Sequence, residues 1–216
     1  FDNGNNFQQW KNGYPSVSTY DLAIQEREAD LAIATFGRAL WILDDIRPLR
    51  KVAAANGSIT KKLTVFSAPD AYQAQYRAAP GYEWSTMGLW DAPNRSRGAA
   101  VSWYVNNASD TAAKKAKADS VQVKIYNEQN ENIRNLKWKT DTGFNRQYWG
   151  MEQKGFRQPG SPKPRPGSPE PASFIVLPGM YKLVITLNKE SDSTFIKVND
   201  DPRFGNRNEI KLAQRK

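Results

Sequence analysis

Apolar and polar residues alternate along most of the second half of the chain. In 121–125 and again in 181–187 every second residue is apolar, which places the apolar side chains of a strand on one face of a sheet. Turn signals rich in Gly, Pro and Asn separate these segments. The pattern predicts an immunoglobulin-like or fibronectin-III-like antiparallel β-sandwich over residues 98–199. Its expected strands include 99–105, 121–125, 133–138, 143–149, 181–187 and 195–198, and Trp103 on the first of them is expected in the core.

Residues 1–45 carry a shorter strand pattern. Strands are expected at 17–24, 31–35 and 39–43, with turn residues between them. This spacing is typical of an antiparallel β-meander. Because a meander of this size is only marginally stable alone, it is expected to need a neighbouring surface.

Residues 46–97 are interpreted as a connector. Pro48 suits the first turn of a short helix at 47–55, and Gly57 suits the left-handed residue after its end. A strand is expected at 63–66. The aromatic segment 68–97 has no regular period and is expected to lie against a domain surface.

Two further segments are not expected to join the sandwich. Residues 157–171 contain six prolines, which no strand ladder tolerates, so an exposed loop is expected there. Residues 200–216 are a basic tail with helical propensity, interpreted as the start of a truncated helix.

Composition narrows the chemistry that the chain can perform. Its 216 residues include neither His nor Cys, which excludes disulfides, thiolate metal sites and Ser-His-Asp triads. We therefore expect no metal, no cofactor and no catalytic residue. The net charge of +9 is dispersed, and its densest clusters lack interleaved aromatic residues, so no nucleic-acid partner is expected. No apolar run is long enough for membrane insertion.

Two groups of side chains are candidate sites. Asp44-Asp45 is a pair of carboxylates, as glycoside hydrolysis requires. Adjacent strand residues point to opposite faces, however, so a structural role at the strand end is expected. Tyr82, Trp84 and Trp90 are candidate ligand-binding residues because aromatic faces stack on sugar rings. The alternative is that their segment docks onto its own domain.

The N-terminal region resembles a known repeat. Asp2-x-Gly4-x-x-Phe7 is similar to the end of an Asp-box turn, in which the carboxylate accepts backbone hydrogen bonds. Residues 21–49 resemble the closing blade of bacterial sortilin-like β-propeller proteins with BNR repeats, a family often described as glycosyl hydrolases. That family commonly has His where this chain has Phe36. The resemblance implies a structural role for Asp2, Gly4 and Phe7, and it makes residues 1–45 the remnant of a final propeller blade.

Residues 119–187 resemble the immunoglobulin-like domain of flagellar hook-capping proteins. The similarity lies in Val121-x-Val123-x-Ile125-Tyr126, Gly143-x-Asn145-x-x-x-Trp149 and Pro178-Gly179-x-Tyr181. Each mark has a physical interpretation. Gly143 permits a turn, Trp149 and Tyr181 fill the core between the sheets, and Pro178-Gly179 fixes the entry to a long strand.

Together the two resemblances imply a non-catalytic accessory or interaction module at the C-terminus of an exported bacterial protein, which would be periplasmic, cell-surface or secreted. The implied partners are the propeller of the same protein and either a polysaccharide or a cell-surface protein. Two alternatives stay open. The chain could be part of a glycoside hydrolase of the BNR or sialidase type, or it could be a carbohydrate-binding module.

Overall fold

The computed structural model describes residues 7, 9, 13–55, 59–74, 96–106, 119–156, 159–160 and 170–203. Within these ranges the regular secondary structure consists of one helix and thirteen strands. The elements in order are β1 (Thr19–Gln25), β2 (Asp30–Thr35), β3 (Leu40–Leu43), α1 (Arg47–Ala54), β4 (Leu63–Val65), β5 (Ala71–Tyr72), β6 (Ala99–Val105), β7 (Asp119–Tyr126), β8 (Asn132–Thr140), β9 (Gly143–Trp149), β10 (Glu152–Lys154), β11 (Ala172–Ile175), β12 (Gly179–Leu187) and β13 (Glu190–Asn199). The chain is all-β, as the alternating pattern predicts.

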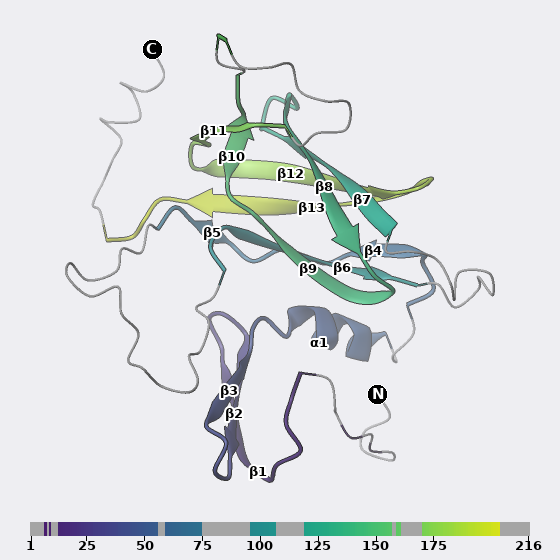
Figure 1. Cartoon of the computed structure of the whole chain (residues 1–216), viewed down its shortest axis with the longest axis vertical. Helices are drawn as coiled ribbons and strands as arrows, with labels where there is room; N and C mark the ends of the chain where they lie inside the picture. The colour runs from purple at the N-terminus through teal and green to yellow at the C-terminus, as the bar shows by residue number, and fades with distance from the viewer. Residues whose placement is uncertain are drawn as a thin grey trace.

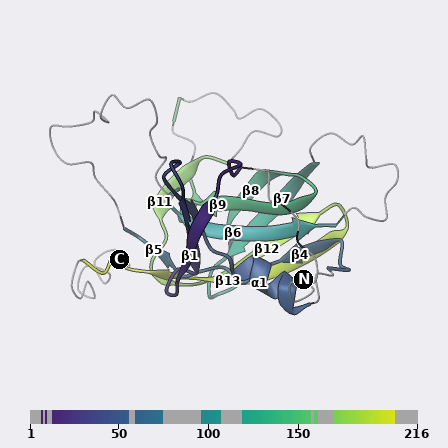
Figure 2. The same cartoon turned by 90° about the horizontal axis from the view of Figure 1, so that it is seen from below.

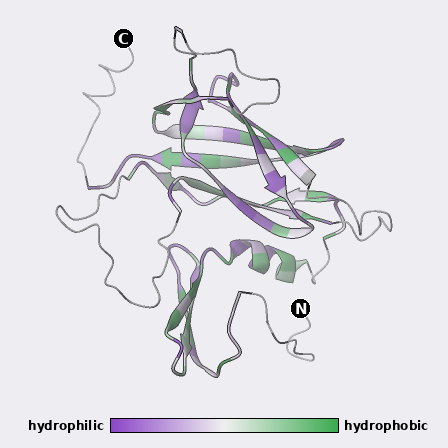
Figure 3. Cartoon of the chain, in the orientation of Figure 1, coloured by the Kyte–Doolittle hydropathy of each residue, from purple (hydrophilic) through white to green (hydrophobic). Residues whose placement is uncertain are grey.

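Two sheets form a sandwich (Figure 1). One has the strand order β4-β6-β9, and the other has the order β5-β13-β12-β7-β8. Neighbouring strands are antiparallel except for β5, which runs parallel to β13. Alternate residues of each strand enter the core, so hydrophobic and hydrophilic bands follow one another along β12 (Figure 3). The predicted immunoglobulin-like or fibronectin-III-like antiparallel sandwich is confirmed.

The tryptophans expected in the core of the sandwich lie there. Trp103 and Trp149 are fully buried. The indole N–H of Trp103 donates to Thr140 Oγ1 at 2.8 Å, and its ring stacks on Trp138 with centroids 5.7 Å apart. Because the indole N–H of Trp103 has a hydrogen-bond partner, burial of this side chain leaves no donor unpaired.

Tyr181 lies near the start of β12 and is also buried. Its hydroxyl donates to the carbonyl of Leu177 at 2.6 Å, and its ring meets Trp149 edge-on at 5.4 Å. A tyrosine that bonds the backbone a few residues upstream is the tyrosine corner of immunoglobulin-type sandwiches. The sequence prediction that Trp149 and Tyr181 fill the space between the sheets is confirmed.

The sandwich begins earlier than the expected residue 98. Strand β4 pairs with β6 in one sheet, and β5 pairs with β13 in the other, so the segment 63–72 passes between sheets. Two side chains of β13 hold it: Asp192 Oδ2 accepts the Val65 N–H at 2.8 Å, and Thr194 Oγ1 accepts the Ala68 N–H at 3.3 Å. Part of the predicted connector therefore completes the sandwich. With two residues, β5 is too short to show an alternating pattern.

Strands β1, β2 and β3 form the separate meander that the sequence predicts, and α1 follows it within one residue of the predicted helix. Both lie on the side of the sandwich formed by β4-β6-β9 (Figures 1 and 2). Lys51 of α1 places its Nζ 5.8 Å from the ring centre of Phe66, which in turn stacks on Phe144 of β9.

A two-stranded sheet of β10 and β11 was not predicted. Its strands flank the proline-rich segment, most of which lies outside the described residues, as do 75–95 of the aromatic connector and the tail from 204 onward. In the part of the chain that the structure covers, no helix has the length and apolarity to cross a membrane.

Candidate functional site

Asp45 lies at the junction between the meander and the sandwich. It follows β3 and has a positive φ of 46°, so it does not continue the strand and the opposite-faces argument does not apply to it. Its carboxylate is buried and bonds both the backbone N–H and the Nε of Arg47, at 3.3 and 2.5 Å. Its own N–H donates to Asp30 Oδ1 at 2.8 Å. The expected structural role at the strand end is what these contacts describe.

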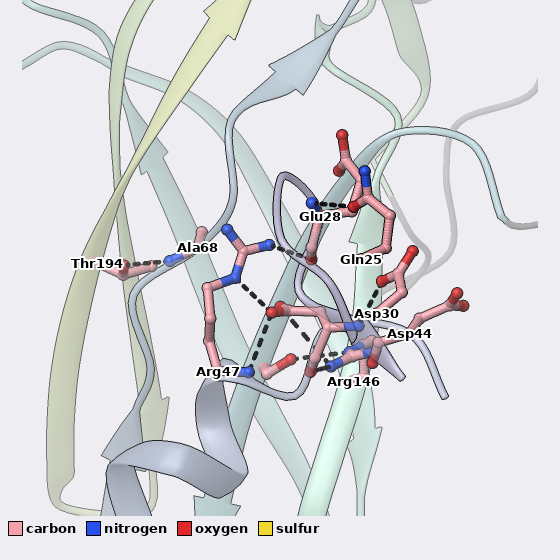
Figure 4. A network of polar contacts seen from close by, with 10 residues as sticks. Gln25, Glu28, Asp30, Asp44, Arg47, Ala68, Arg146 and Thr194 are labelled. Atoms are coloured by element: carbon pink, nitrogen blue, oxygen red, sulfur yellow. Dashed lines mark hydrogen bonds and ion pairs between the residues drawn. The ribbon is translucent and has the colours of Figure 1, made fainter. Parts of the chain in front are cut away.

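Arg146 joins this loop to the sandwich (Figure 4). It lies on β9 directly opposite Ser102 of β6, and both point away from the core. The guanidinium donates to Ser102 Oγ at 2.9 Å and to the carbonyls of Asp44 and Asp45 at 2.7 and 2.8 Å. Its Nη2 is also 3.8 Å from Asp45 Oδ2. Arg146 therefore ties together residues that are about 100 positions apart in the sequence.

A cavity of about 720 Å³ opens beside this network. Its lining combines the apolar side chains of the junction with a small number of polar groups. The lining residues are Leu43, Asp44, Asp45, Pro48, Leu49, Ser102, Phe144, Asn145 and Arg146.

The polar groups of the cavity are largely committed to the fold. Asp45 forms an ion pair with Arg47. The guanidinium of Arg146 donates hydrogen bonds to two carbonyl oxygens and to Ser102 Oγ. The Asn145 amide bonds the backbone of the β8–β9 turn. Glycoside hydrolysis needs two carboxylates with separate acid and base or nucleophile roles, and here only Asp44 offers a carboxylate outside the ion-pair network. Across the ranges that the structure covers, no cluster of three acidic ligands could hold a metal.

A second polar cluster lies at the open edge of β8. Glu170 accepts the backbone N–H of Asn135 at 2.8 Å and its amide at 2.9 Å, and it lies 3.5 Å from Lys154 Nζ. Partial burial acts to raise the pKa of Glu170. The hydrogen bonds from Asn135 and the charge of Lys154 outweigh it, so the pKa is lowered overall. This cluster fixes the chain after the proline-rich segment.

The meander exposes apolar side chains on both faces. Its register places Leu22 and Ile24 on one face and Leu40 and Ile42 on the other. These four side chains are between 46% and 59% exposed. Beside them, the exposed rings of Tyr20 and Phe36 contact each other at 5.6 Å.

The residues singled out in the sequence are placed only in part. Tyr82, Trp84, Trp90, Asp2 and Gly4 lie outside the described residues. Phe7 is described and is 92% exposed. The role of Arg146 could not be predicted from the sequence, because its partners come from a distant segment and no local signal marks it.

The chain was compared with protein-family models, curated proteins and solved structures, and none of them matches.

Proposed function

We propose that the chain is a non-catalytic accessory module, which joins the β-propeller of an exported bacterial protein to its surroundings. The observation that carries this proposal is the meander. A three-stranded sheet with exposed apolar residues on both faces is suited to lie beside further sheet. Every residue of β1 is exposed, and a strand with an open edge can pair with another strand. The resemblance of residues 21–49 to a closing propeller blade supplies the neighbour.

The junction supports a binding role over a catalytic one. The charged groups between meander and sandwich are paired with each other, so they hold the meander in position. A rigid support of this kind suits a module that presents a surface.

Hydrogen exchange tests the position of the meander. We expect the amides of β1 to exchange quickly in the isolated chain and slowly in the longer protein that contains the propeller, because a neighbouring strand would protect them. Amides of β12, inside the sandwich, serve as the control and should exchange equally in both. Equal exchange of β1 in the two proteins would contradict the proposal.

The hydrolase alternative is tested by activity. The purified chain should not hydrolyse a panel of aryl glycosides. The hydrolase alternative would be favoured if the chain hydrolysed one of these substrates, if Asp44→Asn abolished that activity, and if the control Glu190→Gln kept it.

A further inference from the structure

The outer face of the five-stranded sheet is a second surface, on the far side of the core from the β6–β9 pair. Tyr181, Leu183 and Ile185 of β12 are buried, so the residues that alternate with them point outward. The same holds for β7 and β13, whose buried residues also alternate with exposed ones.

Five lysines lie in a diagonal row on this face. Lys197 of β13 is opposite Met180, two residues before Lys182 of β12. Lys124 of β7 is opposite Val184, two residues after Lys182. Each step crosses one strand and advances two residues, which separates diagonal neighbours by about 7–8 Å.

The row continues onto β8 in the same direction. Lys137 is opposite Gln122, two residues before Lys124 in β7, and Lys139 follows two residues later. We call Lys124, Lys137, Lys139, Lys182 and Lys197 the lysine row. It extends over roughly 30 Å of the sheet, from four steps of that size.

The charge of the lysine row is not neutralised on the sheet. The outward positions of β7, β8, β12 and β13 hold no Asp or Glu. None of the five lysines forms an ion pair with a described residue. Three carboxylates lie at the margins: Glu128 accepts the Met180 N–H at 3.0 Å, Asp70 accepts the Asn199 amide at 3.0 Å, and Glu170 is paired with Lys154.

We propose that the lysine row binds an extended anionic polysaccharide. A row of lysines that follows the sheet diagonally from β13 to β8 and then runs along β8 matches a polymer that carries carboxylate or sulfate groups along its length. Four of the lysines are exposed, so they can reach such a polymer without any rearrangement of the sheet.

The neighbours of the row favour sugar over nucleic acid. Gln122 and Ser193 lie beside it and can bond sugar hydroxyls. A single-stranded nucleic acid needs an aromatic ring for each stacked base. Phe195 and Tyr126 on this face both lie opposite Lys182, and the exposed ring of Tyr72 lies opposite Asn199. These three rings leave the β8 end of the row without a stacking surface.

This inference goes beyond the proposed function, because it concerns a different face from the meander.

The test measures binding of the whole chain to polygalacturonate and to heparin by isothermal titration calorimetry at low salt, with neutral dextran and a thymidine oligonucleotide as comparisons. The row variant is Lys124→Gln, Lys137→Gln and Lys182→Gln together. The control variant, Arg38→Gln, Arg50→Gln and Lys61→Gln, removes the same charge from exposed sites that lie outside the five-stranded sheet.

We expect the row variant to bind at least one of the two anionic polysaccharides roughly tenfold more weakly, and the control less than twofold more weakly. The polysaccharide that responds identifies carboxylate or sulfate as the group recognised. Equal loss in both variants would overturn the proposal, since net charge alone would then explain binding. Binding of neither polysaccharide, or tighter row-dependent binding of the oligonucleotide, would also overturn it. Unchanged melting temperatures establish that both variants are folded. Hydrogen exchange in β1 tests the proposed position of the meander, so a failure of that proposal can be told apart from a failure of the lysine row.

Discussion

Tyr181 joins the polar and apolar parts of the sandwich in one side chain. Its ring packs on Trp149, while its hydroxyl bonds Leu177 across the turn that enters β12. Burial, and secondarily the charge of Glu128, raises the pKa of this hydroxyl. The protonated form that the hydrogen bond requires is therefore also the form that the fold favours.

Tyr181→Phe keeps the ring and removes this hydrogen bond. We expect the free energy of unfolding to fall by about 1 kcal/mol, because the Leu177 carbonyl loses its donor. Urea denaturation monitored by tryptophan fluorescence measures the change. Tyr148→Phe, which removes a hydroxyl that bonds no described group, is the matched control and should change stability by less than about 0.5 kcal/mol.

Glu170 makes stability depend on pH. Its pKa is lower in the folded chain than the ordinary 4.5, so its contribution is present above that value and is lost as pH falls through the lowered folded pKa. Glu170→Gln should therefore destabilise the chain at pH 7, by about 1 kcal/mol or less, and have less effect at pH 3. Urea denaturation at both pH values tests this. An equal effect at the two would show that charge is not involved, and Glu190→Gln is the exposed control.

At the scale of elements, two glycines at the starts of strands have similar φ angles but different surroundings. Gly98 precedes β6 with φ of 103°, and a Cβ there would lie 2.4 Å from the Trp149 carbonyl oxygen. Gly143 begins β9 with φ of 97° and has nothing within 4 Å of that position. The first glycine is required by close packing and backbone angle together, the second by backbone angle alone.

Gly143→Ala should cost about 1 kcal/mol for the strained backbone. Gly98→Ala should cost at least about 2 kcal/mol more, because the strand must also move away from Trp149. Thermal denaturation of the two variants separates the steric contribution from the conformational one. Equal losses would mean that the β6–β9 pair adjusts without cost.

Elements with strong local patterns could be predicted from the sequence, and those defined by distant pairing could not. Strand β12 alternates over nine residues, and α1 has Pro48 in its first turn, so both were found. Strands β5, β10 and β11 are short, and they exist because of partners elsewhere in the chain. The same reason applies to the junction. The adjacent carboxylates of Asp44 and Asp45 are visible in the sequence, but the proximity of Asp45 to Arg146 is a property of the tertiary structure.

At the scale of the whole molecule, Arg146 holds the meander against the sandwich. Arg146→Met should release β1–β3 while leaving the sandwich folded, because its hydrogen bonds to the carbonyls of Asp44 and Asp45 are lost and Asp45 loses a nearby cation. We expect local opening of the meander to become easier by about 2 kcal/mol or more. Hydrogen exchange resolved by residue measures this.

Arg27→Met is the control for the loss of an arginine, since the described ion pair of Arg27 is with Glu28, the next residue, and its side chain is 79% exposed. Unchanged protection of β1–β3 in Arg146→Met would mean that the apolar contacts around α1 hold the meander without the arginine.

The parallel pairing of β5 with β13 has a mechanical consequence. Ala71 and Tyr72 lie beside Val198 and Asn199, and the Gln73 N–H bonds the Asn199 carbonyl at 3.0 Å. Tension that reaches the chain just before Ala71 and just after Asn199 would pull β5 and β13 in opposite directions along their length, because the two strands run parallel. The bonds between them would be loaded in shear and would have to break together, whereas an antiparallel terminal pair pulled from one end opens bond by bond. A parallel pair of this kind therefore resists such tension better than an antiparallel pair would.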